Sequence, residues 1–165
     1  MARYVILLLL AIAVVALALL IAGQMGFLRG TAPDDLGVKE GKLKRISKTE
    51  NSASSQADLW TDHPLRDYAR VEPIQYSGDG KAAMAKLASI VKALPRTAVV
   101  TQDPGYLYAQ CSTALMKYTD DVEFYLDEPA GVIHARSSSR LGQKDFGVNK
   151  ARIEEIRKLF SQLPA

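Results

Sequence analysis

The apolar positions of this chain begin with one uninterrupted run near the N-terminus. Residues 5–22 carry no polar side chain, and Tyr4 and Gly23 extend the run. A helix of about 20 apolar residues, rising about 1.5 Å per residue, crosses the roughly 30 Å hydrocarbon core of a bilayer. We therefore predict a transmembrane anchor over residues 4–24. The apolar core of a cleaved signal is shorter, but the small residues at 22–23 leave cleavage open as the alternative.

The next stretch shows neither a helical nor a strand period. Residues 30–80 are rich in Ser, Asp, Gly and Pro, as irregular segments are. We expect a linker or coil over residues 25–57 and a globular domain over residues 58–165. The basic residues at 39–48 fit a solvated linker, or contact with anionic lipid headgroups. Trp60 is the single Trp, and an aromatic side chain in so polar a segment is expected to dock on the domain.

Periodicity returns near residue 80 and continues almost to the C-terminus. Asp79 is a suitable N-cap for a helix whose apolar side chains recur every three or four residues up to Pro95. Asn149 is the expected N-cap of a final amphipathic helix. Between these helices, apolar and polar residues alternate in four segments, which predicts strands at 97–102, 106–113, 121–126 and 132–137.

This order of elements predicts an α+β fold. Short connections between strands favour antiparallel pairing, so we expect a small antiparallel four-stranded sheet with both amphipathic helices on one face. A four-residue turn at 127–130 would place Phe124 opposite Ile133 and Glu123 opposite His134. Shifting the pairing by one residue would mix apolar and polar side chains on both faces of the sheet.

Composition removes several classes of function. Beyond residue 29 the chain has 19 Lys and Arg against 18 Asp and Glu, so it lacks the basic excess of a nucleic-acid-binding domain. The single Cys, Cys111, lies on the apolar face of a predicted strand and is expected to be a core residue. The only two His residues, His63 and His134, and the lack of a Gly-rich phosphate loop give no basis for a metal or a cofactor, so we expect none.

The polar face of the predicted sheet holds one candidate catalytic pair. Glu123 and His134 would face each other there and could act as the general acid and base of a hydrolase-type enzyme. That interpretation requires a cleft that also contains Tyr108 and Gln110. The competing interpretation, which we prefer, is an exposed sheet face with weak cross-strand charge pairs.

A second candidate site lies where the last strand meets the last helix. Its members are side chains that suit a carboxylate or phosphate beside a helix N-terminus, namely Arg136, Ser138, Arg140, Asn149 and Arg152. Nearby acids offer the opposite interpretation, in which the same arginines are neutralised inside the protein. Those acids are Asp120, Asp121, Glu123 and Asp145.

Three C-terminal motifs, in this order, resemble domain-of-unknown-function family 1499. They are Asp-Asp-Val-Glu-Phe-Tyr at 120–125, Arg-Ser-Ser-Ser-Arg-Leu-Gly at 136–142 and Asp-Phe-Gly-Val-Asn-Lys-Ala-Arg-Ile-Glu at 145–154. Residues 35–43 and 54–56 are also similar, so the resemblance covers about 33–163. Members of the family often carry a pair of Cys residues. Here Ser52 stands in one of those places and Ile46 near the other, which removes any disulfide or thiol role for the pair.

The resemblance implies a location more than an activity. The family comprises bacterial and plastid proteins, often with a signal or anchor, and has no established activity. It implies a bacterial inner-membrane protein with a periplasmic domain, although the basic residues flanking the apolar run do not decide the orientation. We therefore expect a non-enzymatic binding or accessory module, held in the lipid bilayer, for an anionic ligand or for a protein partner in a membrane complex.

Overall fold

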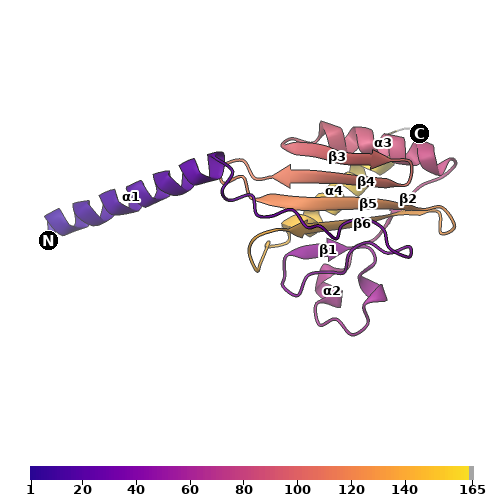
Figure 1. Cartoon of the computed structure of the whole chain (residues 1–165), viewed down its shortest axis with the longest axis horizontal. Helices are drawn as coiled ribbons and strands as arrows, with labels where there is room; N and C mark the ends of the chain where they lie inside the picture. Colours follow the sequence, from indigo (N-terminus) through magenta and orange to yellow (C-terminus); the bar gives the residue numbers. More distant parts are fainter. Residues whose placement is uncertain (164–165) are drawn as a thin grey trace.

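One antiparallel sheet lies at the centre of the domain (Figure 1). The computed structural model describes residues 1–163. The strands are β1 (Ser52–Ser54), β2 (Ile74–Gln75), β3 (Thr97–Asp103), β4 (Tyr106–Ser112), β5 (Thr119–Asp127) and β6 (Val132–Ser139). They lie in the order β1-β6-β5-β4-β3, and β2 also pairs with β6. The predicted α+β class and antiparallel pairing are confirmed, but the sheet has six strands rather than four.

Two amphipathic helices cover one face of this sheet, as predicted (Figure 1). These two helices are α3 (Gly80–Ala93) and α4 (Val148–Gln162). The other helices are α1 (Ala2–Gln24) and α2 (Arg66–Ala69), and a 3-10 turn, η1, lies at Ala57–Leu59. The core lies between α3, α4 and the apolar sides of β4, β5 and β6, where Leu87, Phe124 and Ile153 are fully buried. Both α2 and η1 are short turns that the hydrophobic period did not predict.

The start of α3 follows the prediction, whereas the start of α4 does not. The Asp79 side chain caps α3 by accepting a hydrogen bond from the Ala82 N–H at 2.7 Å. In α4 the N-cap position is taken by Gly147, and the capping carboxylate is that of Asp145. It accepts hydrogen bonds from the N–H groups of Gly147 at 3.0 Å and Asn149 at 2.8 Å. The prediction that Asn149 is the N-cap is therefore wrong. The Asp145 carboxylate, in the preceding loop, accepts the hydrogen bonds at the start of α4 instead.

The pairing of β5 with β6 also differs from the prediction. Phe124 lies opposite Ala135 and Glu123 opposite Arg136, so the predicted register is wrong by two residues. The turn occupies residues 128–131, where Gly131 supplies a φ of +66°. A shift of two residues leaves every side chain on its predicted face, so hydrophobic alternation alone does not detect it.

The two additional strands come from the part of the chain predicted to be irregular. β1 and β2 are three and two residues long, too short for a period to show. The chain before β1, residues 30–51 and here called the strap, crosses the sheet face opposite α3 and α4 (Figure 1). Ile46 of the strap is buried against Ala57 and Ala69, and Trp60 packs on this cluster as predicted.

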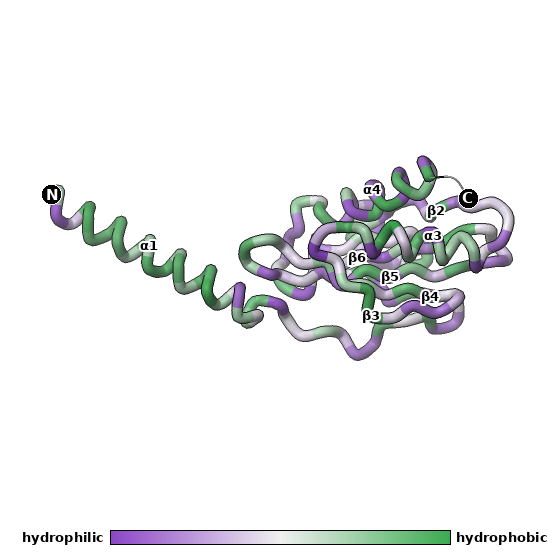
Figure 2. Tube along the Cα trace, turned by 90° about the horizontal axis from the view of Figure 1, so that it is seen from above, coloured by the Kyte–Doolittle hydropathy of each residue, from purple (hydrophilic) through white to green (hydrophobic). Residues whose placement is uncertain are grey.

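The N-terminal helix α1 projects from one end of the domain (Figure 1). It is the one helix within residues 1–163 that is long and apolar enough to cross a membrane. Apolar residues continue over nearly its whole length (Figure 2), and their side chains are exposed on all sides. This arrangement is typical of a helix surrounded by lipid rather than one packed in a protein core.

Candidate anion-binding cleft

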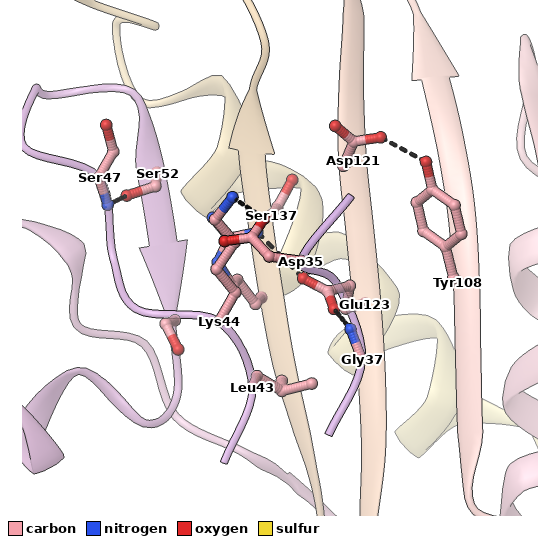
Figure 3. A network of polar contacts seen from close by, with 12 residues as sticks. Asp35, Gly37, Leu43, Lys44, Ser47, Ser52, Tyr108, Asp121, Glu123 and Ser137 are labelled. Carbon is pink, nitrogen blue, oxygen red and sulfur yellow. Dashed lines mark hydrogen bonds and ion pairs between the residues drawn. The ribbon is translucent and has the colours of Figure 1, made fainter. Parts of the chain in front are cut away.

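The sheet face beneath the strap carries buried charges. Successive side chains on a strand point to opposite faces, so Asp121, Glu123 and Arg136 point away from the helices. Their exposed fractions are only 1%, 0% and 3%. Figure 3 shows the reason, because the strap residues around Gly37 and Lys44 run directly in front of β5 and β6. The expectation of an exposed sheet face is therefore wrong.

Glu123 is surrounded by hydrogen-bond donors. Its carboxylate accepts from Arg136 Nη1 at 3.0 Å, from the Tyr106 hydroxyl at 2.9 Å and from the Gly37 backbone N–H at 2.9 Å. Burial, and then the charge of Glu123, raise the pKa of Tyr106, so its hydroxyl stays protonated and continues to donate. The Gly37 bond, drawn in Figure 3, fastens the strap to β5.

Asp121 is held in a similar way by Arg140. The guanidinium donates to both carboxylate oxygens, from Nε at 2.9 Å and from Nη2 at 2.7 Å, which makes a bidentate pair. The Tyr108 hydroxyl donates a third hydrogen bond to Asp121 at 2.6 Å. The hydrogen bond with Asp121 raises the pKa of Arg140, so the guanidinium stays charged.

A third arginine pair lies on the helix face of the sheet. Arg152 of α4 donates to Asp120 at 2.7 Å and to the Ser137 hydroxyl at 2.8 Å. The Ser137 hydroxyl in turn donates to the Asn149 side chain at 2.5 Å. Each of the three arginines of the second candidate site is thus bound to one of the acids named for it. Internal neutralisation is confirmed for these pairs, while Asp145 caps α4 instead.

The sheet separates the five residues predicted to bind an anion. Arg136, Ser138 and Arg140 lie on the strap side and line one cleft. Asn149 and Arg152 approach β6 from the helix side, through Ser137. The five residues therefore do not converge on one ligand.

The predicted pairing of Glu123 with His134 is wrong. His134 lies opposite Tyr125 in the sheet, and the two rings stack with centroids 6.1 Å apart. Its Nδ1 lies 3.1 Å from the Ser55 hydroxyl, and burial lowers its pKa. The hydrolase interpretation depended on these two side chains meeting, and the shifted register places Arg136 in that position instead.

A cleft of about 770 Å³ opens between the strap and the C-terminal end of β6. Five basic side chains line it against two acidic ones, but four of the five are in ion pairs, with Asp35, Asp62, Glu123 and Asp121, so Lys48 is the basic side chain of the lining without an ion pair within residues 1–163. The basic residues are Lys44, Arg45, Lys48, Arg136 and Arg140, and the acidic ones are Asp62 and Asp121. Four hydroxyl side chains on strap and strand also line it, namely Thr31, Ser47, Ser138 and Ser139.

One buried donor atom of Arg136 has no partner in the described part of the chain. Its Nη1 is bonded to Glu123, but its Nε has no hydrogen-bond partner within residues 1–163. The side chain is only 4% exposed, so solvent does not compensate for the missing bond. A buried donor without a partner costs about 1–3 kcal/mol. An acceptor bound in the cleft would remove this cost.

The donor set of the cleft suits an anion better than a cation. Guanidinium, ammonium and hydroxyl groups donate hydrogen bonds to carboxylate or phosphate oxygens. Within residues 1–163, no group of three or more His, Cys, Asp or Glu side chains is placed to hold a metal ion.

Sequence reasoning missed the contribution of the strap. Lys44, Arg45 and Lys48 belong to a segment predicted to be a linker, yet they form one wall of the cleft. The concentration of basic residues at 39–48 was the available signal. It could not be connected with β6, because only tertiary contacts such as that of Gly37 with Glu123 bring the two together.

Comparison with known proteins adds a family but no activity. A search of curated proteins found no match. The family described as "Protein of unknown function (DUF1499)" matches residues 42–160, from the middle of the strap through the whole sheet and into α4. The resemblance of the C-terminal motifs is thereby confirmed, and the chain belongs to this family of proteins of unknown function.

Proposed function

We propose that this protein is a membrane-anchored module that binds a small anionic ligand in the cleft between the strap and β6. The observation that carries the proposal is the buried, unpartnered Nε donor of Arg136, a residue that lines the cleft together with Lys48, which is in no ion pair within residues 1–163. Proteins leave few buried donors without partners, so an unpartnered donor in a residue that lines a cleft points to an acceptor bound there.

The chemistry of the lining favours a carboxylate or phosphate group. Arg136 offers a planar donor, Ser138 offers a hydroxyl beside it on β6, and Lys48 adds a mobile positive charge at the rim. A volume of about 770 Å³ lies within the range of small-molecule sites. The ligand would be a small organic acid or a phosphorylated compound.

Binding is a better account of this cleft than catalysis. Asp121 and Glu123 are the buried carboxylates nearest to it, and both are engaged by an arginine and a tyrosine. Because their oxygens are occupied by these donors, neither carboxylate is placed to take a proton from a bound molecule.

Thermal unfolding of the full chain in detergent tests the proposal. Raising inorganic phosphate at constant ionic strength should raise the melting temperature, because a ligand at 100 times its Kd stabilises by about 2.7 kcal/mol. Ser138→Val and Lys48→Met should each reduce this shift without lowering the melting temperature in chloride. Lys92→Met, an exposed lysine in the last turn of α3, is the matched control. Equal melting temperatures in phosphate and chloride, repeated with citrate, would refute anion binding.

The proposed location is the bacterial inner membrane, with α1 as a single span and the domain in the periplasm. The length and apolar character of α1 support the span, and the family resemblance motivates the location. An alkaline phosphatase fused after residue 165 should be active, since that enzyme matures only outside the cytoplasm. An inactive phosphatase fusion together with an active cytoplasmic reporter at the same position would reverse the orientation.

Alternatively, the cleft binds a protein partner in a membrane complex instead of a small ligand. The observation that favours it is the exposed mouth of the cleft, where the strap residues Arg45 and Lys48 are accessible to a large acidic partner. Co-purification in mild detergent, abolished by Lys48→Met and retained by Lys92→Met, would distinguish this from a small ligand.

A further inference from the structure

The end of α1 is joined to the domain by the loop between β4 and β5. The Gln24 side chain donates a hydrogen bond to the Leu115 carbonyl at 2.8 Å. Gly23 is buried, and a Cβ atom at this position would lie only 2.7 Å from the Met116 carbonyl oxygen. Helix and loop therefore meet backbone to backbone, which sets the height of the loop relative to the helix.

The length of α1 sets the height of this joint relative to a bilayer. Its 23 residues span about 35 Å, little more than the roughly 30 Å hydrocarbon core. A helix that crosses the core with so little excess ends at the headgroup boundary. The β4–β5 loop, fixed to Gln24, then lies at the same level.

Apolar side chains gather around this joint and are left exposed. Phe27 is 73% exposed and Leu115 is 66% exposed. Met25, Tyr118 and Leu141 are the other large exposed apolar residues near the joint, and Leu141 lies next to Gly30 of the strap. We call Met25, Phe27, Leu115, Tyr118 and Leu141 the basal surface. Arg29 and Lys117 stand among them in the sequence.

This composition is typical of a surface at the membrane boundary. Aromatic residues with a polar end, such as Tyr118, concentrate at the headgroup level, and long basic side chains reach from apolar surroundings to lipid phosphates. In water, exposed apolar side chains grouped around one joint would be a liability for solubility.

We propose that the basal surface is inserted into the interfacial layer of the same bilayer that holds α1, so that the domain lies against the membrane. This inference rests on the anchoring part of the proposed function. Gly30 packs on Arg140, and Thr31 and Pro33 line the cleft. The cleft therefore opens close to the lipid headgroups.

Depth-dependent quenching in nanodiscs tests this inference on the full chain. In a Cys111→Ala background, an environment-sensitive fluorophore is attached through Leu115→Cys, or through Leu163→Cys at the end of the domain far from α1 (Figure 1). Spin-labelled lipids should quench the fluorophore at 115 several-fold more than at 163, and its emission should shift to the blue. Burial of such surfaces reaches about 5–10 Å into the boundary region.

A third label, through Ile12→Cys in the middle of α1, separates the two proposals. Quenching at 12 but equal, weak quenching at 115 and 163 would overturn the membrane contact of the basal surface while leaving the anchor intact. Absence of quenching at 12 would overturn the anchor and the basal contact together. Phe27→Cys provides a second position in the basal surface, should labelling at 115 disturb the loop.

Discussion

At the scale of single residues, the domain is held by charges that are buried in pairs. Glu123 with Arg136 and Asp121 with Arg140 lie under the strap, with side chains no more than 6% exposed. Such pairs add little net stability over apolar residues, but removal of one partner leaves an uncompensated buried charge. These pairs fix how β5, β6 and the strap are placed, because each buried charge must keep its partner within hydrogen-bond distance.

Replacement of Glu123 by Ala should therefore be severely destabilising. Arg136 would remain buried without its counter-charge, and the free energy of unfolding should fall by about 3–5 kcal/mol. Urea denaturation of the detergent-solubilised protein measures this change. Glu128→Ala, at the exposed β5–β6 turn, is the control and should have little effect. A loss below about 1 kcal/mol for Glu123→Ala would mean that the pair is not buried.

A pH effect should arise at Asp145. Burial alone would raise its pKa, but hydrogen bonds from the Asn149 and Gly147 N–H groups outweigh burial and lower it. A carboxylate with a lowered folded-state pKa contributes stability above its unfolded pKa of about 4, and the contribution is lost as the pH falls through the folded value. Wild type should thus lose more stability below pH 4 than Asp145→Asn does, with a cap contribution of about 1 kcal/mol at neutral pH. Parallel acid unfolding curves for the two proteins would contradict this.

At the scale of elements, the strap behaves as part of the domain. Its backbone N–H groups donate to buried side chains, from Gly37 to Glu123 and from Leu43 to Gln56, with both distances below 3.0 Å. A flexible linker would instead give these N–H groups to water. The strap also separates the charged pairs from solvent. Opposite charges attract more strongly where water is excluded, so the strap strengthens these pairs.

Hydrogen exchange should show the strap protected. The amides of Gly37 and Leu43 should exchange far more slowly than those of Gln143 and Lys144 in the exposed β6–α4 loop. Gln56→Ala should remove protection at Leu43 and leave that at Gly37. Exchange of both strap amides at the rate of the exposed loop would restore the linker interpretation.

The joint between α1 and the domain should be sensitive to one methyl group. Gly23→Ala would bring a Cβ within 2.7 Å of the Met116 carbonyl oxygen, so the helix must separate from the loop. A spin label attached through Thr113→Cys should then become more mobile, while the melting temperature of the domain stays the same. Ala18→Val, on an exposed part of α1, is the control. An unchanged spectrum in Gly23→Ala would show that the contact is not maintained.

At the scale of the whole molecule, the protein is a two-layer domain with one helix pointing away from it (Figures 1 and 2). The core on one face of the sheet supplies stability, and the strap on the other face shapes the cleft. These roles are separable, because the apolar and polar side chains of β4, β5 and β6 alternate across the sheet.

Deletion of residues 2–24 should release the protein from membranes. The full chain should remain in the pellet after alkaline carbonate washing, whereas the shortened chain should be recovered in the supernatant with the same domain melting temperature. The intact mass of the mature protein from cells should include α1. A mature form that starts after Gly23 would identify α1 as a cleaved signal.

Local pattern determined the apolar helix, the α+β class, both core helices, the two faces of the sheet and the family, because each is encoded by periodicity or by motifs within a short stretch of chain. Tertiary structure alone decided the register of Glu123 with Arg136, the cap from Asp145, the two short strands and the place of the strap. A shift of two residues preserves alternation, and a polar segment without a period can equally be a free linker or a lid over charges. The candidate site was predicted only in part. Its arginines were identified from the sequence, but their partners, and the cleft that Arg136 lines with an unpartnered buried Nε, depend on residues that lie far apart in the chain.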